Sequence, residues 1–457
     1  MPTPPRASGA PALRRELSLR DLIVFGLLFI GPLAPVGVYG VLDAKADGAV
    51  ALVYVVATLA MACTAWSYAQ MSRHVPHAGS VFAYAREGLG ATAGFIAGWM
   101  IMLDYLLIPA VAYLFSGIAL HALVPAVPAW IFTIVAFGAT TLLNLLGVRH
   151  AARVGRVALV AELVVLAIFI LSALVLLIDH GAPRALASPF TGVTGTLSPS
   201  ALAGAISIAV LSFLGFDAIA SFAEESTGDS RQVGRAIVAC LAIAGVAFVA
   251  QAYLVGVLSR VAPAQLAADP RSQGTAFYDI VRVAIGGWLA VLLAVTKAVG
   301  PAFAAMTGQG AAARLLYGMA RDGGLPASLA QVDSNRGVPR TALATVGVLT
   351  ISCAVWAARR DDGLGLLVSI VDIGALTSFV LLHASVVGYF VVRRLGARTW
   401  WHLAIPLAGG AVCAWVLAEA SPLAQRIGAA WFGVGVLAVI GQRSRLRRAA
   451  LRVPRPD

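Results

Sequence analysis

Apolar residues fill this chain in long runs, separated by short polar stretches that hold most of the charges. A helix needs about 20 apolar residues to cross the hydrocarbon core of a bilayer. The pattern predicts twelve such segments, at about 20–43, 48–72, 92–120, 124–147, 154–178, 200–223, 234–258, 285–311, 340–357, 364–392, 401–418 and 427–441. We therefore expect an all-α integral membrane protein, because a β-barrel would instead show shorter segments of alternating polarity.

Two of these segments contain residues that interrupt a helix. The first reads FIGPLAPVGVYG and the sixth reads SFLGFDA, with a break at Gly215. Prolines and glycines at this density do not fit a regular helix. The two segments begin two halves of five helices each, about 20–180 and 200–395. Interrupted helices at matching positions indicate a transporter site near the midplane, so we predict a five-plus-five inverted repeat with broken helices 1 and 6. Two unrelated kinks would give the same pattern.

The basic residues predict the orientation of the chain in its membrane. The net charge is +12 and comes almost entirely from arginine. In a soluble protein this charge would suggest nucleic acid, but an excess of arginine in cytoplasmic loops explains it better. The head (1–19) and the tail (443–457) are basic, and an even number of spans keeps them on one side. We expect both to be cytoplasmic, around a transport core (20–395) and two peripheral helices (396–442).

Asp217 is the first residue to suggest chemistry, because it stands in the interrupted sixth segment. Unwound backbone inside a membrane leaves polar groups that protein, water or ligand must satisfy. Carbonyls near Ser212 and Phe213, together with a carboxylate at Asp217, would form a site for a cation. The alternative is that Asp217 only caps the second half-helix, and the two roles are compatible.

The first segment complements this site. Its break runs through Gly31, Pro32, Leu33, Ala34 and Pro35. The half-helix that follows presents an N-terminus with partial positive charge, which suits a substrate carboxylate. An amine at one break and a carboxylate at the other describe an amino acid, whereas a ligand with amines alone would not need the second feature.

Glu162 and Lys297 are charged residues deep inside apolar segments. Glu162 lies in VALVAELVVLAIF, where a bare charge is costly, so it is either a proton carrier or a static polar contact. Lys297 lies in LLAVTKAVGPAF and is one of two lysines in the chain. It either extends outward along the helix, pairs with Glu162 or Asp372, or responds to substrate.

Three further polar residues lie within predicted spans. Asp104 and its neighbour Tyr105 occur in MLDYLLIPA, and Asp372 occurs in SIVDIGALTSF. Tyr105 suits either a binding pocket or ordinary packing, and Asp372 is close enough to its helix start to act as a cap. We retain all three as candidates for contact with the substrate.

The sequence offers little to support other chemistry. Four cysteines sit singly in apolar runs, and neither a CxxC pair nor a histidine cluster indicates a metal. We find no nucleophile constellation or phosphate loop, so we expect no enzyme activity and no cofactor.

Four stretches in order resemble a known family. PHAGSVFAYAREGLG, GWMIMLDYLLIP, LSFLGFDAIASFAEES and RLLYGMARDGGLP resemble the amino acid–polyamine–organocation permeases, and within them most resemble putrescine importers. The resemblance implies a five-plus-five inverted repeat fold in a bacterial inner membrane. It implies a substrate site made by the break at Gly31 to Pro35 and by Ser212, Phe213, Gly215 and Asp217, with help from helices 3, 8 and 10. In some relatives a lysine in helix 5 takes the place of sodium; spacing puts Glu162 at that point, which is a departure.

Together these features predict a secondary transporter that imports putrescine-like polyamines by alternating access and couples their uptake to protons. The competing hypotheses are a proton-coupled amino acid permease and an amine exchanger. A channel would not concentrate its substrate, and a receptor would be expected to carry an added soluble domain. The exact substrate and the oligomeric state stay open.

Overall fold

The computed structural model describes residues 17–75, 80–146, 148–195, 197–222, 226–229, 231–321, 325–331, 339–396 and 398–450. The outermost parts of the predicted tails, 1–16 and 451–457, lie outside these residues, as do parts of three of the stretches that resemble the permeases. The described part of the chain is helical, with one isolated bridge between Leu17 and Ser226.

All twelve predicted segments coincide with helices. The elements that correspond to them are α1 (Leu19–Ile30) with α2 (Ala34–Lys45), α3 (Val50–His74), α5 (Ala91–Leu123), α6 (Ala129–Leu146), α7 (Val148–His180), α9 (Pro199–Val210) with η1 (Leu211–Phe213) and η2 (Phe216–Phe222), α10 (Gln232–Leu258), α14 (Gly287–Arg321), α15 (Arg340–Ala358), α16 (Gly363–Val386) with η4 (Val387–Val392), α17 (Trp401–Ala418) and α18 (Pro422–Ala450).

Within the described ranges, nine helices are long and apolar enough to cross a membrane, and the bent pair α1–α2 makes a tenth. Two shorter apolar helices, Ala129–Leu142 and Pro199–Phe213, lie in the remaining two predicted segments. The protein is thus an all-helical, multi-pass membrane protein. The exact count of twelve spans and the inverted relation of the two halves stay predictions.

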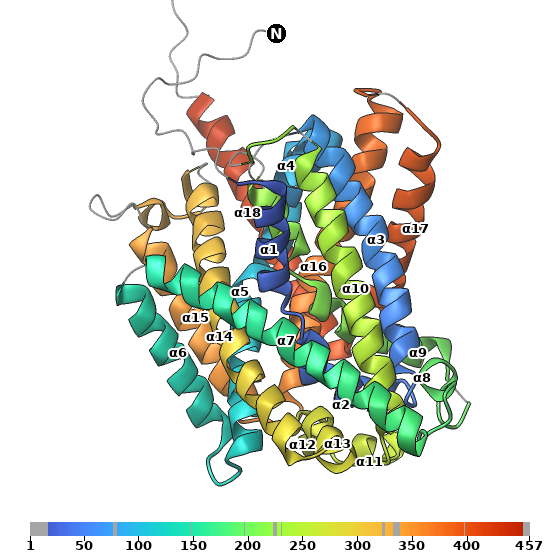
Figure 1. The fold of residues 1–457 in the computed structure, drawn as a ribbon. Helices are drawn as coiled ribbons and strands as arrows, with labels where there is room; N and C mark the ends of the chain where they lie inside the picture. Colours follow the sequence, from blue (N-terminus) through green and yellow to red (C-terminus); the bar gives the residue numbers. More distant parts are fainter. Residues whose placement is uncertain are drawn as a thin grey trace, which may run out of the picture.

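Short helices that the hydrophobic pattern did not predict join the long ones. They are α4 (Ser80–Leu89), α8 (Ser188–Thr191), α11 (Pro263–Ala268), α12 (Pro270–Gln273), α13 (Ala276–Ala284) and η3 (Ala327–Ala330). Figure 1 shows α11, α12 and α13 gathered beside α2 at one end of the bundle, where all three contact it. They are too short to span a bilayer.

Long helices surround the two broken segments. In Figure 1, α3 and α10 run side by side, while α7 crosses the bundle obliquely. Helix α5 packs closely on both α14 and α16. Proline lies inside α5 at Pro109 and inside α14 at Pro301, where it removes a backbone hydrogen bond and favours a bend.

Both expected breaks are present. Helix α1 ends at Ile30, Gly31 adopts a positive φ of 74°, and α2 begins at Ala34, at an angle of 44° between the two helices. In the sixth segment the helical path stops at Leu214, and Gly215 has a φ of 117°. Glycine adopts these angles readily because it has no Cβ.

The two breaks lie against each other. A Cβ placed on Gly215 would be 2.5 Å from Phe29 Cδ1, in the last turn of α1. Segments almost 200 residues apart in the chain therefore meet at the interruptions that the sequence predicted.

Candidate functional site

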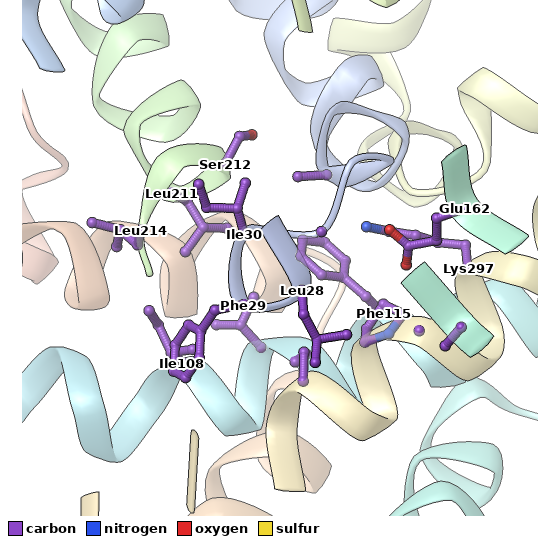
Figure 2. Close-up of a pocket in the computed structure, with 18 of the residues that line it drawn as sticks. Leu28, Phe29, Ile30, Ile108, Phe115, Glu162, Leu211, Ser212, Leu214 and Lys297 are labelled. Carbon is purple, nitrogen blue, oxygen red and sulfur yellow. The ribbon is translucent and has the colours of Figure 1, made fainter. Parts of the chain in front are cut away.

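A cavity of about 70 Å³ lies beside the first break, between α1, α5, α7, η1 and α14. Its walls are mostly apolar, and Figure 2 shows Leu28, Phe29, Ile30, Ile108, Phe115, Leu211 and Leu214 around it. The charged residues that line it are Glu162 and Lys297. We call this space the main cavity.

Glu162 reaches the break from α7. Its Oε2 accepts a hydrogen bond from the Leu33 backbone N–H at 3.5 Å. A Cβ on Gly300 of α14 would collide with the other carboxylate oxygen. Glycine at this position of α14 leaves room for the carboxylate between the break and α14.

Lys297 faces the same cavity from α14. Its side chain is 3% exposed, so it does not extend out along the helix as one alternative had it. Nζ lies 5.1 Å from the centre of the Phe115 ring, in the range of a cation–π contact. Figure 2 shows Glu162 and Lys297 on the same side of the view. The structure thus brings Lys297 to Glu162 and not to Asp372.

A second, smaller cavity holds Asp217. It has a volume of about 10 Å³ and is lined by Phe29, Asp104, Tyr105, Ile108, Gly215, Asp217 and Gly308. Phe29 and Ile108 also line the main cavity, so the two spaces share a wall. We call the smaller space the side chamber.

Asp217 is held by two hydrogen bonds. Its Oδ1 accepts the backbone N–H of Gly215 at 3.2 Å, and its Oδ2 accepts the Tyr105 hydroxyl at 3.3 Å. Asp217 thus accepts a hydrogen bond from the backbone at the break, as the capping alternative expected, although Asp217 itself lies in the first turn of η2. One oxygen still faces Tyr105 in the chamber, so the capping and binding roles are compatible here.

Asp104 of α5 lines the side chamber together with Asp217, and Asp372 lies on α16, which packs against α5. Asp372 lines neither cavity, and it lies in the interior of α16, which excludes a capping role.

Of the remaining predicted residues, some line the main cavity and others support the segments around it. Gly31, Ala34 and Ser212 line the main cavity. Pro32 does not line it; its carbonyl accepts a hydrogen bond from Gln251 of α10 at 2.9 Å. Leu33 contributes its N–H to Glu162, and Pro35 lies in the first turn of α2.

Phe213 points away from both cavities. Its ring packs 6.3 Å from that of Tyr54 and 5.0 Å from that of Phe248. Tyr54 also shares a hydrogen bond of 2.9 Å with Ser212. We therefore assign Phe213 a packing role, holding η1 against α3 and α10.

Sequence reasoning missed three supporting groups. Gln251, a polar residue in an apolar segment, was a usable signal. Asp43 of α2 is fully buried and forms two hydrogen bonds with Arg184, at 3.0 and 3.2 Å, which tie α2 to the chain after α7. Burial disfavours the charged guanidinium, but the hydrogen bonds and charge of Asp43 outweigh it and raise the pKa of Arg184. No local pattern identified this pair.

Known proteins resemble the chain over nearly its whole length. The family described as amino acid permease matches residues 22–441. The low-affinity putrescine importer PlaP of Escherichia coli (strain K12) is 28% identical over 438 residues, which cover 93% of each chain. The branched-chain amino acid permease BcaP of Bacillus subtilis (strain 168) is 27% identical, over 83% of this chain and 82% of that protein.

The methylthioribose transporter of Bacillus subtilis (strain 168) is 25% identical over 94% of each chain. Because the family match covers most of the sequence, the chain belongs to the amino acid permease family. It is a membrane transporter and not an enzyme.

Proposed function

We propose that this member of the amino acid permease family imports small primary amines of the putrescine type by alternating access around the two breaks. The observation that carries the proposal is Asp217, a buried carboxylate at the second break, 3.3 Å from the Tyr105 hydroxyl in a chamber beside the main cavity. A buried carboxylate needs a positive partner, and an amine supplies one. The similarity to a putrescine importer supports this choice of substrate.

We place proton coupling at Glu162 and Lys297. The pair stands where α7 and α14 meet the first break, so a change in its charge would alter the hydrogen bond to Leu33. A carboxylate that gains a proton no longer attracts the ammonium of Lys297. Protonation of Glu162 would then free Lys297 and loosen the break.

Membrane potential supplies a second source of energy. One charge moving through 100 mV gains about 2.3 kcal/mol, which supports about 50-fold accumulation. A dication gains twice as much. We therefore expect uptake to respond to potential as well as to pH, with both chain termini on the cytoplasmic side of a bacterial inner membrane.

A second candidate is a permease for amino acids with apolar side chains. The apolar walls of the main cavity favour it, as does the similarity to a branched-chain amino acid permease. In this alternative Asp217 only supports the break.

The test is uptake of labelled putrescine into proteoliposomes, with a panel of amino acids as competitors. We expect putrescine to accumulate in the wild type and Asp217→Asn to abolish uptake. The matched control is Asp179→Asn, the same change at an exposed position near the end of α7. Uptake of a labelled branched-chain amino acid, with no uptake of putrescine, would establish the alternative.

A further inference from the structure

The turn between η4 and α17 carries three exposed arginines and no acidic residue. They are Arg393, Arg394 and Arg398. None of the ion pairs among the described residues includes them. By contrast, Arg271 and Arg360, which lie beyond the opposite end of α16, each pair with an aspartate. The turn therefore concentrates positive charge to which the described part of the chain gives no ion-pair partner, and such a surface attracts an anion.

Backbone contacts give this turn a defined conformation. The last turn of the α16 span widens into the π-helix η4, and the Leu395 N–H then donates to the Tyr389 carbonyl at 3.1 Å. Arg394 has a φ of 54°, which residues other than glycine rarely adopt. Arg393 reaches α4, where its Nη1 donates to the Glu87 carbonyl at 2.9 Å, although the Glu87 carboxylate makes no ion pair with the described part of the turn. Single π-turns are frequent at functional sites.

Exposed tryptophans follow the arginines at the start of α17. Trp400 and Trp401 are 64% and 48% exposed, and their rings stack on each other. Leu403 and Leu407 continue this apolar surface along the helix. Figure 1 shows α17 beside α3 at the edge of the bundle. Because tryptophan is enriched where a membrane meets water, the pair marks the depth of the lipid headgroups, and Arg398, just before it, lies at the level of the lipid phosphates.

Stacked rings hold this surface against α3. The His402 ring of α17 stacks on Phe390 of η4, with 4.0 Å between the ring centres. His74, at the end of α3, lies 5.0 Å from the same Phe390 ring. Trp66 of α3 lies 5.5 Å from the His402 ring, whose Nδ1 accepts the Thr399 N–H at 3.1 Å. The packing of three elements thus fixes the backbone beneath the charges, which lowers the entropy that is lost when a ligand binds.

We propose that the turn between η4 and α17, together with Trp400 and Trp401, binds the headgroup of an anionic phospholipid. A guanidinium binds a phosphate through two parallel N–H bonds, and Arg394 and Arg398 supply two such groups. The indole rings and the exposed leucines of α17 then lie along an acyl chain. The charge pattern predicts this end of the bundle to be cytoplasmic, where anionic lipids attract basic clusters beside a span. The site is independent of which substrate the protein carries.

Native mass spectrometry of the full chain in detergent tests this site by identifying the first lipid that stays bound. The protein is mixed with equal amounts of phosphatidylglycerol, which is anionic, and phosphatidylcholine, which has the same phosphate but no net charge. One arginine near an anionic lipid strengthens binding by about fivefold. We therefore expect the wild type to retain phosphatidylglycerol over phosphatidylcholine by at least about fivefold. In the double variant Arg394→Gln with Arg398→Gln we expect this preference to fall below about twofold.

A matched double variant, Arg260→Gln with Arg426→Gln, removes two exposed arginines at the other end of the bundle, after α10 and near the start of α18. It should keep the wild-type preference. The site is overturned if the preference survives Arg394→Gln with Arg398→Gln, or if both double variants lose it equally. Displacement of the lipid by millimolar inorganic phosphate would also overturn it, in favour of a site for a free anion. Equal retention of the two lipids by the wild type refutes the proposal even if a variant fails to fold.

Discussion

Gly215→Ala offers a direct test of how the two breaks meet. Gly215 has a φ of 117°, which L side chains rarely adopt, and its replacement by alanine costs about 1–3 kcal/mol in backbone strain. The new Cβ would also lie 2.5 Å from Phe29 Cδ1 and 3.2 Å from the Phe29 carbonyl carbon. Overpacking of this kind costs about 1–3 kcal/mol more. We therefore expect Gly215→Ala to lower the free energy of unfolding by about 2–6 kcal/mol.

Thermal unfolding of the detergent-purified protein measures this loss. The unfolding entropy is about 2.1 cal/mol/K per residue. For a chain of 457 residues, this loss of free energy therefore lowers Tm by about 2–6 °C. Gly310→Ala is the matched control, because a Cβ there meets nothing within 4 Å and Gly310 lies within α14. Removing a glycine from a helix interior stabilises by about 0.5–1 kcal/mol. Equal Tm values for the two variants would refute the contact between the breaks.

The displaced ring connects this change to function. Phe29 lines both the main cavity and the side chamber. If Phe29 moves to make room for the new Cβ, both spaces change shape. We expect Gly215→Ala to weaken putrescine binding, whereas Gly310→Ala leaves it at the wild-type value.

Two further variants test the charged groups around the breaks. Asp43→Asn leaves the largely buried Arg184 side chain without its counterion, and breaking a buried pair costs about 3–5 kcal/mol. A fall in Tm checks this, whereas Asp361→Asn at an exposed pair should leave Tm almost unchanged. Lys297→Met leaves Glu162 without its cation, so uptake driven by a pH gradient should fall at least about tenfold. If the double variant with Glu162→Gln loses no more of this uptake than Lys297→Met alone, the two residues act as a unit; normal uptake in the single variant would contradict the coupling role.

Local sequence was sufficient for the long helices and for the two breaks. Hydrophobic runs predicted α17 to the residue, at 401–418, because an apolar stretch bounded by polar residues has few other solutions in a membrane. Gly31 and Pro32 predicted the first break, since proline restricts the residue before it. The amphipathic helix α13 was missed because nine residues fall below the length that marks a span.

Pairings across the chain were beyond the reach of sequence reasoning. Glu162 contacts Leu33 across 129 positions, and Arg184 contacts Asp43 across 141. Such contacts depend on how whole helices pack, and no spacing rule encodes them. The orientation of Phe213 illustrates the same limit: its neighbour Ser212 lines the main cavity, but the turn of η1 directs Phe213 toward Tyr54 and Phe248.

The distribution of charge over the two cavities is what separates an amine from an amino acid as the substrate. The main cavity holds one acid and one base, Glu162 and Lys297, and lies beside the start of α2, whose N-terminus favours negative charge. A substrate carboxylate finds a partner there. The acids that line the side chamber are Asp104 and Asp217, and no lysine, arginine or histidine lines it, so it favours an ammonium group over a carboxylate. An amino acid can place its carboxylate in the main cavity, whereas putrescine offers ammonium groups alone and has no group for Lys297. Comparing the uptake of labelled putrescine with that of a labelled branched-chain amino acid in wild-type proteoliposomes therefore tests which substrate the two cavities accept.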